Sequence, residues 1–175
     1  MCRDGTPSGY AVFELNGSEV KWYYKGVGQS RNKQFRTYDM NSVKVFFSKP
    51  EVMTVMGQLS GNRNNDYTSI PQNTVVLNIW NYDPEWTIEV KENGSKLTPQ
   101  RVYMKDPLHT LTYDYPRQRD NGAVTDGFTT GFNPHMFQVV TGSTTSTLEI
   151  KVTDRFGNVY AETMTRPKPF ILSME

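Results

Sequence analysis

The sequence predicts an all-β protein: an antiparallel two-sheet sandwich of the immunoglobulin or fibronectin type III kind, with an N-terminal β-hairpin extension. Apolar and polar residues alternate through several short segments, which is the period of a strand with one buried face. Turn-forming residues separate these segments, and no long helical period interrupts them. The 10 Tyr, 9 Phe and 3 Trp supply large rings for the core, although only 36% of the residues are hydrophobic.

The first expected element is a β-hairpin over residues 10–25. Its two halves alternate apolar and polar side chains on either side of Asn16-Gly17. We expect a type I′ turn at this dipeptide, because Asn and Gly readily take the positive φ that both central positions require. The apolar face would then carry Ala11, Phe13, Leu15, Val20, Trp22 and Tyr24.

The middle of the chain combines strands with one irregular segment. Residues 34–38 are expected to form a third, shorter strand. Residues 40–72 show no sustained period and are interpreted as irregular, with a short helical turn over 52–56 after Pro50. Residues 74–80 are apolar on both faces, which is typical of a strand that is covered on both sides.

The second half of the chain predicts the rest of the sandwich. The alternation WTIEVK begins at Trp86, and Asn93-Gly94 offers a second tight turn into Lys96-Leu97 and a strand near 101–104. Residues 106–134 are rich in Pro and Gly, so we interpret them as a long surface connection that covers an edge or an interface. Strands then follow over 136–140, 148–152 and 159–164, and the last two form a terminal hairpin.

These elements predict four segments along the chain. Residues 1–7 would be a linker from an upstream domain, and residues 8–72 a hairpin and irregular extension packed on the sandwich. Residues 73–166 would form the sandwich core, and residues 167–175 a tail.

Charge and hydropathy exclude two classes of partner. The 19 Lys and Arg against 18 Asp and Glu give a net charge of +1, and no run of one sign suggests nucleic-acid binding. No apolar segment approaches the roughly 20 residues of a membrane helix, so no membrane insertion is expected. The single cysteine, Cys2, excludes an internal disulfide.

The chain also lacks a recognisable catalytic or cofactor motif. His109 and His135 have no Cys, His or carboxylate cluster at ligand spacing, so neither a metal site nor a bound cofactor is expected. Gly26-Val27-Gly28 lacks the third glycine of a phosphate loop, and Cys2 lies too near a terminus to be held against a base. We therefore predict no catalytic residue.

The aromatic segment 80–86 is the candidate binding feature. Trp80, Tyr82 and Trp86 could form a stacking platform for a glycan or a partner protein, because flat rings bury area at little entropic cost. Core packing is the competing interpretation, since Trp86 begins an alternating strand and the exposure of Trp80 depends on which sheet face is covered.

Several segments, in order along nearly the whole chain, carry a family resemblance: DGTPSGYAVFELNG, VKWYYKGVG, VVLNIWNYDPEWTIEVKENG and VTDRFGNVYAETM. This pattern resembles the C-terminal domain that follows the catalytic domain in calcineurin-like metallophosphoesterases of the Bacteroides type. The resemblance implies an upstream metallophosphatase domain with a dinuclear metal centre, a start at Met1 inside a longer polypeptide, and a periplasmic or cell-surface location in a Gram-negative bacterium.

None of the family's metal-binding motifs occurs here. DxH, GDxxD, GNH[DE] and GHxH hold the two cations of that centre. Gly61-Asn62-Arg63 begins like the third motif but has Arg where the His belongs. We therefore expect a non-catalytic accessory domain that packs on the catalytic domain and borders its substrate cleft. The alternative hypothesis is a carbohydrate- or envelope-binding module that uses Trp80, Tyr82 and Trp86.

Overall fold

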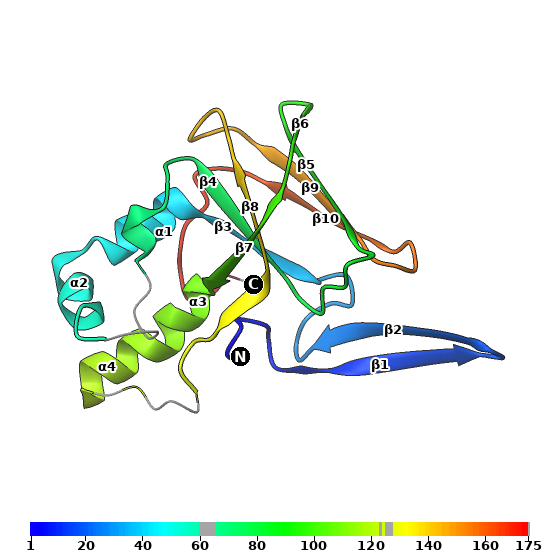
Figure 1. The fold of residues 1–175 in the computed structure, drawn as a ribbon, viewed down its shortest axis with the longest axis horizontal. Helices are drawn as coiled ribbons and strands as arrows, with labels where there is room; N and C mark the ends of the chain where they lie inside the picture. The colour runs from blue at the N-terminus through cyan, green and yellow to red at the C-terminus, as the bar shows by residue number, and fades with distance from the viewer. Residues whose placement is uncertain (60–65, 123, 125–127, 175) are drawn as a thin grey trace.

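A computed structural model of the chain describes residues 1–59, 66–122, 124 and 128–174. Within these residues the strands form three antiparallel sheets, and Figure 1 shows the two larger sheets stacked beside a group of short helices. The first sheet, here called the central sheet, has the order β3-β4-β8-β7. The second, here called the outer sheet, has the order β10-β9-β5-β6, and β1 and β2 form a separate hairpin. The predicted β-sandwich is thus confirmed.

The strands agree with the sequence prediction in most places. The hairpin consists of β1 (Gly9–Asn16) and β2 (Glu19–Gly26). The central sheet contains β3 (Phe35–Asp39), β4 (Thr74–Ile79), β7 (Gln100–Lys105) and β8 (Phe132–Val140). The outer sheet contains β5 (Thr87–Glu92), β6 (Ser95–Leu97), β9 (Leu148–Thr153) and β10 (Val159–Met164).

The two hairpin turns differ from each other. Asn93 and Gly94 form the predicted tight turn, and both have positive φ, 49° and 81°, as type I′ geometry requires. The turn at Asn16-Gly17 was predicted wrongly. Asn16 pairs with Glu19, so Gly17 and Ser18 are the central residues, and of these two only Gly17 has positive φ, at 59°. Glycine at the first central position is typical of a type II′ turn, whose twist also suits a hairpin.

The sandwich core lies between the two larger sheets. It is built from the inward faces of their strands, and β4 is buried along its whole length, as predicted. Leu148, Ile150 and Val152 of β9 point into this core, which confirms the predicted alternation. The other face of the central sheet is covered by a second cluster, which comes mainly from the helices. β4 therefore contributes to both clusters.

The helices are the main departure from the sequence prediction. The predicted turn near 52–56 is confirmed as α2 (Pro50–Met56), but α1 (Met40–Phe47) was not predicted. A 3₁₀ turn, η2 (Tyr67–Ser69), follows. The expected surface connection is wrong over its first half, which is a continuous helical segment: α3 (Pro107–His109), η3 (Thr110–Asp114) and α4 (Tyr115–Asn121). No helix in the described part of the chain is long and apolar enough to cross a membrane.

The helical segment forms because it begins with a strong start signal. The carboxylate of Asp106 accepts a hydrogen bond from the backbone N–H of His109, and Pro107 occupies the first turn. Leu108 and Leu111 then fall on one face and pack into the second cluster. Burial of this face keeps the segment on the central sheet rather than in solvent.

Candidate functional site

The segment before the hairpin is inserted into the body of the domain. The backbone carbonyl of Asp4 accepts hydrogen bonds from Nδ2 of Asn78 at 2.8 Å and from Nδ2 of Asn133 at 3.1 Å. Both asparagines are buried and come from β4 and β8 of the central sheet. The backbone N–H of Gly131 donates to the carbonyl of Arg3 at 2.9 Å. The residues predicted to form a linker are therefore hydrogen-bonded into the fold.

Asp106 is the central acceptor of this buried cluster. Its Oδ2 accepts from the Tyr38 hydroxyl at 2.6 Å and from Nδ2 of Asn78 at 2.7 Å, while its Oδ1 accepts from the N–H of His109 at 2.8 Å. Burial and the charge of Asp106 both raise the pKa of Tyr38, so the Tyr38 hydroxyl stays protonated and donates. The backbone of Gly5 lies against the same carboxylate.

Contacts with His135 and Thr6 fix the side chain of Asp4. Nε2 of His135 lies 3.2 Å from Oδ2 of Asp4, and the N–H of Thr6 donates to Oδ1 of Asp4 at 2.9 Å. Burial alone would raise the pKa of Asp4, but the hydrogen bonds from His135 and Thr6 lower it to about 2. Asp4 is therefore ionised at neutral pH, and it links the N-terminal segment to β8.

This cluster holds the chain in place rather than reacting with a substrate, because Asp106 and Asn78 are fully buried. The sequence prediction did not find it. The partners come from segments that lie 28 to 131 residues apart in the chain, so the local alternation of apolar and polar residues does not reveal their contacts. Two local signals in the sequence pointed to parts of this cluster: Asp106-Pro107, which can start a helix, and the glycine that follows Asp4.

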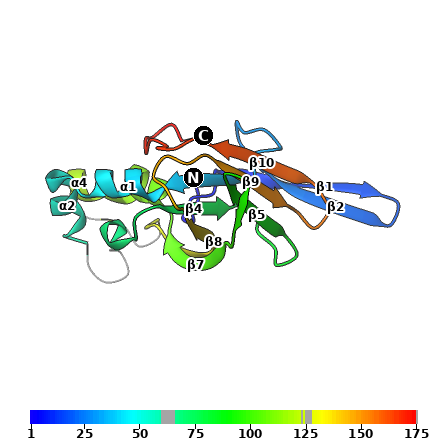
Figure 2. The ribbon, with the colours of Figure 1, turned by 90° about the horizontal axis from the view of Figure 1, so that it is seen from above.

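The hairpin is the second part of the candidate site. Figures 1 and 2 show β1 and β2 projecting from the sandwich, with the turn at the far end. Midway along the hairpin the apolar face touches the body: Trp22 packs edge-on against Phe156 of the β9–β10 turn, with ring centroids 4.8 Å apart. The same face is open at Phe13, which lies opposite Trp22, and from there to the tip: Phe13 is 60% exposed, Leu15 74% and Val20 45%. We call these three residues the hairpin tip face.

Arg31 braces the opposite face of the hairpin. Its guanidinium forms two hydrogen bonds to the Glu14 carboxylate, at 2.8 and 3.3 Å, and stacks 3.9 Å from the ring centroid of Tyr23. These contacts hold the hairpin in a set orientation while leaving the hairpin tip face uncovered by the described residues. An open apolar face on a braced hairpin has the chemistry of a docking surface.

The comparison with protein-family models decides the family. A model described as the C terminal of calcineurin-like phosphoesterase matches residues 1–160. The chain belongs to this family. No curated protein and no solved structure matches it. The matched range includes both the inserted N-terminal segment and the hairpin, so this phosphoesterase C-terminal domain starts before its first strand.

The three aromatic candidates of the phosphoesterase C-terminal domain lie largely inside it. Trp80 is 0% exposed and Trp86 9%, and Trp86 packs on Tyr160 with ring centroids 6.0 Å apart. Tyr82 is only partly buried and packs edge-on against Phe137 at 4.9 Å. The three rings therefore do not form a common exposed platform, and ligand stacking on them stays a prediction.

The two histidines of the domain have structural partners. Nδ1 of His109 lies 2.7 Å from Oγ1 of Thr130, and both side chains are buried, so a substrate does not reach this pair. Burial lowers the pKa of His109, against the opposing charges of Asp114 and Asp106. No group of three or more His, Cys, Asp or Glu that could hold a metal ion occurs in the described ranges. The described His, Cys, Asp and Glu residues therefore do not provide the ligand set of the two-metal centre of a calcineurin-like phosphatase.

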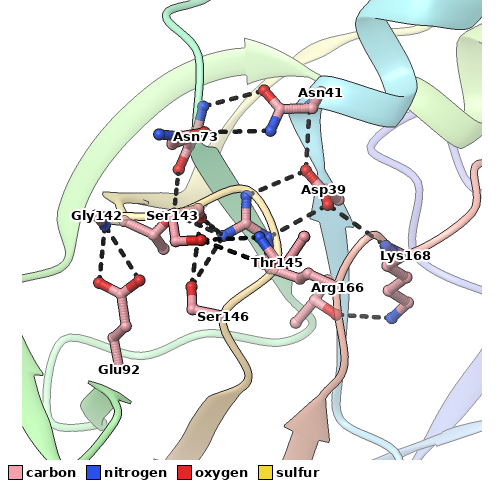
Figure 3. A network of polar contacts seen from close by, with 12 residues as sticks. Asp39, Asn41, Asn73, Glu92, Gly142, Ser143, Thr145, Ser146, Arg166 and Lys168 are labelled. Carbon is pink, nitrogen blue, oxygen red and sulfur yellow. Dashed lines mark hydrogen bonds and ion pairs between the residues drawn. The ribbon is translucent and has the colours of Figure 1, made fainter.

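The polar network around Arg166 is also structural. Figure 3 shows the Arg166 guanidinium between the Asp39 carboxylate and the loop over residues 141–146. Nε donates to Asp39 at 3.2 Å, and Nη1 donates to Oγ1 of Thr141 at 2.6 Å and to the carbonyl of Ser143 at 2.7 Å. Because the Arg166 and Asp39 side chains are buried and mutually satisfied, they tie the end of the chain to the start of α1.

Proposed function

We propose that this chain is the non-catalytic accessory domain of a metal-dependent phosphohydrolase whose catalytic domain lies upstream in the same polypeptide. The family match over residues 1–160 supports this assignment. The absence of DxH, GDxxD, GNH[DE] and GHxH from the sequence supports it further, because those residues bind the two metals and activate the water. In this proposal the upstream domain holds the metal pair and this chain supplies no catalytic residue.

The position of residue 1 supports the proposal that the upstream domain packs on the hairpin. The amino group of Met1 donates to Oγ of Ser8 at 3.0 Å, so residue 1 lies beside the foot of β1. The N–H of Val27, just after β2, donates to the carbonyl of Ser8 at 2.8 Å. A domain joined ahead of residue 1 would therefore begin next to the hairpin, and its surface is the occupant that we assign to the hairpin tip face.

The chemistry of the hairpin tip face supports that occupant. Phe13, Leu15 and Val20 expose apolar area, and each square ångström removed from water is worth roughly 25 cal/mol. A two-stranded hairpin is only marginally stable in water, so a second surface against it would stabilise both partners. The tip is the part of the hairpin farthest from the sandwich, as Figure 1 shows, and we place it at the border of the substrate cleft.

Activity measurements test the assignment to an accessory domain. Residues 1–175 should not hydrolyse bis(p-nitrophenyl) phosphate with added Mn²⁺ or Zn²⁺, whereas the longer polypeptide with its upstream domain should. Turnover by the 175-residue chain, retained after removal of contaminating phosphatases, would rule the assignment out.

Variants of the two hairpin faces test the packing in the longer polypeptide. Phe13→Ser with Leu15→Ser should loosen the contact between the domains, so that the two domains unfold in separate thermal transitions and residues 1–8 become sensitive to protease. Tyr10→Ser is the matched control, because Tyr10 is also an exposed aromatic residue but lies on the opposite face of β1. Equal behaviour of the two variants would refute the packing proposal and leave the accessory assignment standing.

A further inference from the structure

A small pocket opens between the edge strands of the two larger sheets. Its volume is about 260 Å³, and it lies where β3 of the central sheet approaches β10 of the outer sheet. The hydroxyl of Thr37 in β3 donates to Oε1 of Glu162 in β10 at 2.5 Å, which joins the two edges behind the pocket. The pocket is lined by Asn32, Lys33, Phe35, Ala161, Glu162 and Lys168.

One oxygen of Glu162 is satisfied and the other is not. Oε1 accepts from Thr37 and from Nζ of Lys168 at 2.9 Å. Oε2 is buried and has no hydrogen-bond partner among the residues that the structure describes. A buried carboxylate oxygen without a donor costs free energy, so Glu162 is poised to accept a hydrogen bond at Oε2.

Lys33 faces this oxygen without reaching it. Its Nζ lies 4.0 Å from Oε2 of Glu162, which is beyond hydrogen-bond distance, and both side chains are mostly buried. Burial lowers the pKa of Lys33, and the nearby charges of Lys168 and Arg36 act in the same direction against the attraction of Glu162. Among the described residues, the pocket thus holds a donor and an acceptor that form a long ion pair but no hydrogen bond with each other.

The combination of a cationic donor, Lys33, and an anionic acceptor, Glu162, determines which class of ligand can bind in the pocket. A phosphate or carboxylate would accept from Lys33, but its negative charge would be repelled by the carboxylate of Glu162, and a carboxylate also has no proton to donate at neutral pH. A cation would be repelled by Lys33 and Lys168. A hydroxyl group both accepts and donates, so it can accept from Nζ of Lys33 while donating to Oε2 of Glu162.

We propose that this pocket binds a small hydroxylated ligand of the sugar or polyol class, with one hydroxyl between Lys33 and Glu162. The Asn32 amide, which also lines the pocket, offers a donor and an acceptor for a second hydroxyl. The volume suits one ring rather than a longer chain. The site is separate from Trp80, Tyr82 and Trp86, and it does not depend on an upstream domain because all six lining residues belong to this chain.

Ligand-observed NMR on residues 1–175 tests the proposal, with glucose, galactose, mannose, N-acetylglucosamine and glycerol as probes and inorganic phosphate as the anionic comparison. At least one hydroxylated probe should bind with a dissociation constant on the order of 1 mM, the range expected for a single small site. Phosphate should neither bind nor displace it. Binding of phosphate in place of the sugars, or of no probe at all, would overturn the proposal and leave an ion pair bridged by solvent.

Variants identify the pocket as the place of binding. Glu162→Gln and Lys33→Met should each weaken binding about tenfold or more, because each removes a charged hydrogen-bond partner. Asn32→Ala should also weaken binding, because it removes the partner of the second hydroxyl, and Lys151→Met on the exposed face of β9 is the control. Thermal unfolding of each variant confirms that it folds. Binding unchanged by both Glu162→Gln and Lys33→Met would place the sugar elsewhere and refute the assignment.

Discussion

Gly5 lies so close to Asp106 that a Cβ atom added to residue 5 would fall 2.0 Å from the Cγ atom of Asp106. Gly5 also has a φ of +83°, which side chains rarely adopt. Two constraints therefore require glycine here: the left-handed backbone and the approach to a buried carboxylate. The contact joins the N-terminal segment to the start of the helical segment, 101 positions further along the sequence.

Substitution at residue 5 should separate these two constraints. Gly5→Ala should lower the free energy of unfolding by about 3 kcal/mol, from the positive φ and from the clash with Asp106. Gly157→Ala is the matched control, because Gly157 has a φ of +82° but no atom within 4 Å of an added Cβ, and it should cost only about 1 kcal/mol. Urea unfolding measures both. Equal losses would mean that the segment around Gly5 moves away from Asp106 at little cost.

The Asp4–His135 pair predicts a loss of stability in acid. The pKa of Asp4 is lowered to about 2 from a model-peptide value of 3.8, so its contribution is complete above pH 3.8 and is lost as the pH falls toward 2. The side chain of Asp4 is 37% exposed, and solvent screening limits the contribution to about 1 kcal/mol. Asp4→Asn should remove this part of the pH dependence. Urea unfolding between pH 5 and 2.5 checks it, and identical slopes in both proteins would contradict the assignment.

The buried ion pair predicts a large effect of Arg166. Arg166→Met should destabilise the domain by about 3–5 kcal/mol, because it leaves the Asp39 carboxylate buried without its cation. Adding Asp39→Asn should recover part of the loss, so that the double variant loses less than the sum of the single variants. Arg119→Met removes an exposed pair with Asp120 and should leave the unfolding midpoint unchanged. Additive losses at residues 39 and 166 would show that the pair is not coupled.

Tryptophan quenching checks the burial of the aromatic candidates. Trp22 is partly exposed on the hairpin, whereas Trp80 and Trp86 lie in the interior, so iodide should quench Trp22 almost alone. Trp22→Phe should therefore leave a blue-shifted emission that iodide scarcely changes and that added monosaccharide does not perturb. Strong quenching in that variant would show that the ring of Trp80 or Trp86 reaches solvent and would favour stacking by residues 80–86.

The strands could be predicted because their determinants are local. Alternation over β9 and β10 and the Asn93-Gly94 turn specify a face and a reversal within a few residues. The helix α1 was missed although Met40, Val43 and Phe47 recur at helical spacing and Asp39 caps its start. Eight residues are too few for periodicity alone to identify a helix, and packing on β3 and β4 decides the outcome.

The segment after Asp106 was missed for a different reason. Pro116 suggested a connection, because proline cannot donate the hydrogen bond of a helix interior. In the structure the helix widens to π geometry over residues 110–114, just before this proline, and continues into α4. The buried polar cluster around Asp106 and the pocket at Glu162 depend on contacts between distant segments, so the sequence pattern carried no information on either.

The hydrogen bonds of Asp4 and Gly5 to the central sheet and to Arg36 also determine how the domain would move in a larger assembly. A flexible Gly/Ser linker lets two domains rotate independently, whereas a segment that is hydrogen-bonded into a buried polar cluster does not allow this independent rotation. A fluorescent reporter fused ahead of residue 1 should therefore rotate together with the domain as one particle, and the decay of its anisotropy would report the size of the whole.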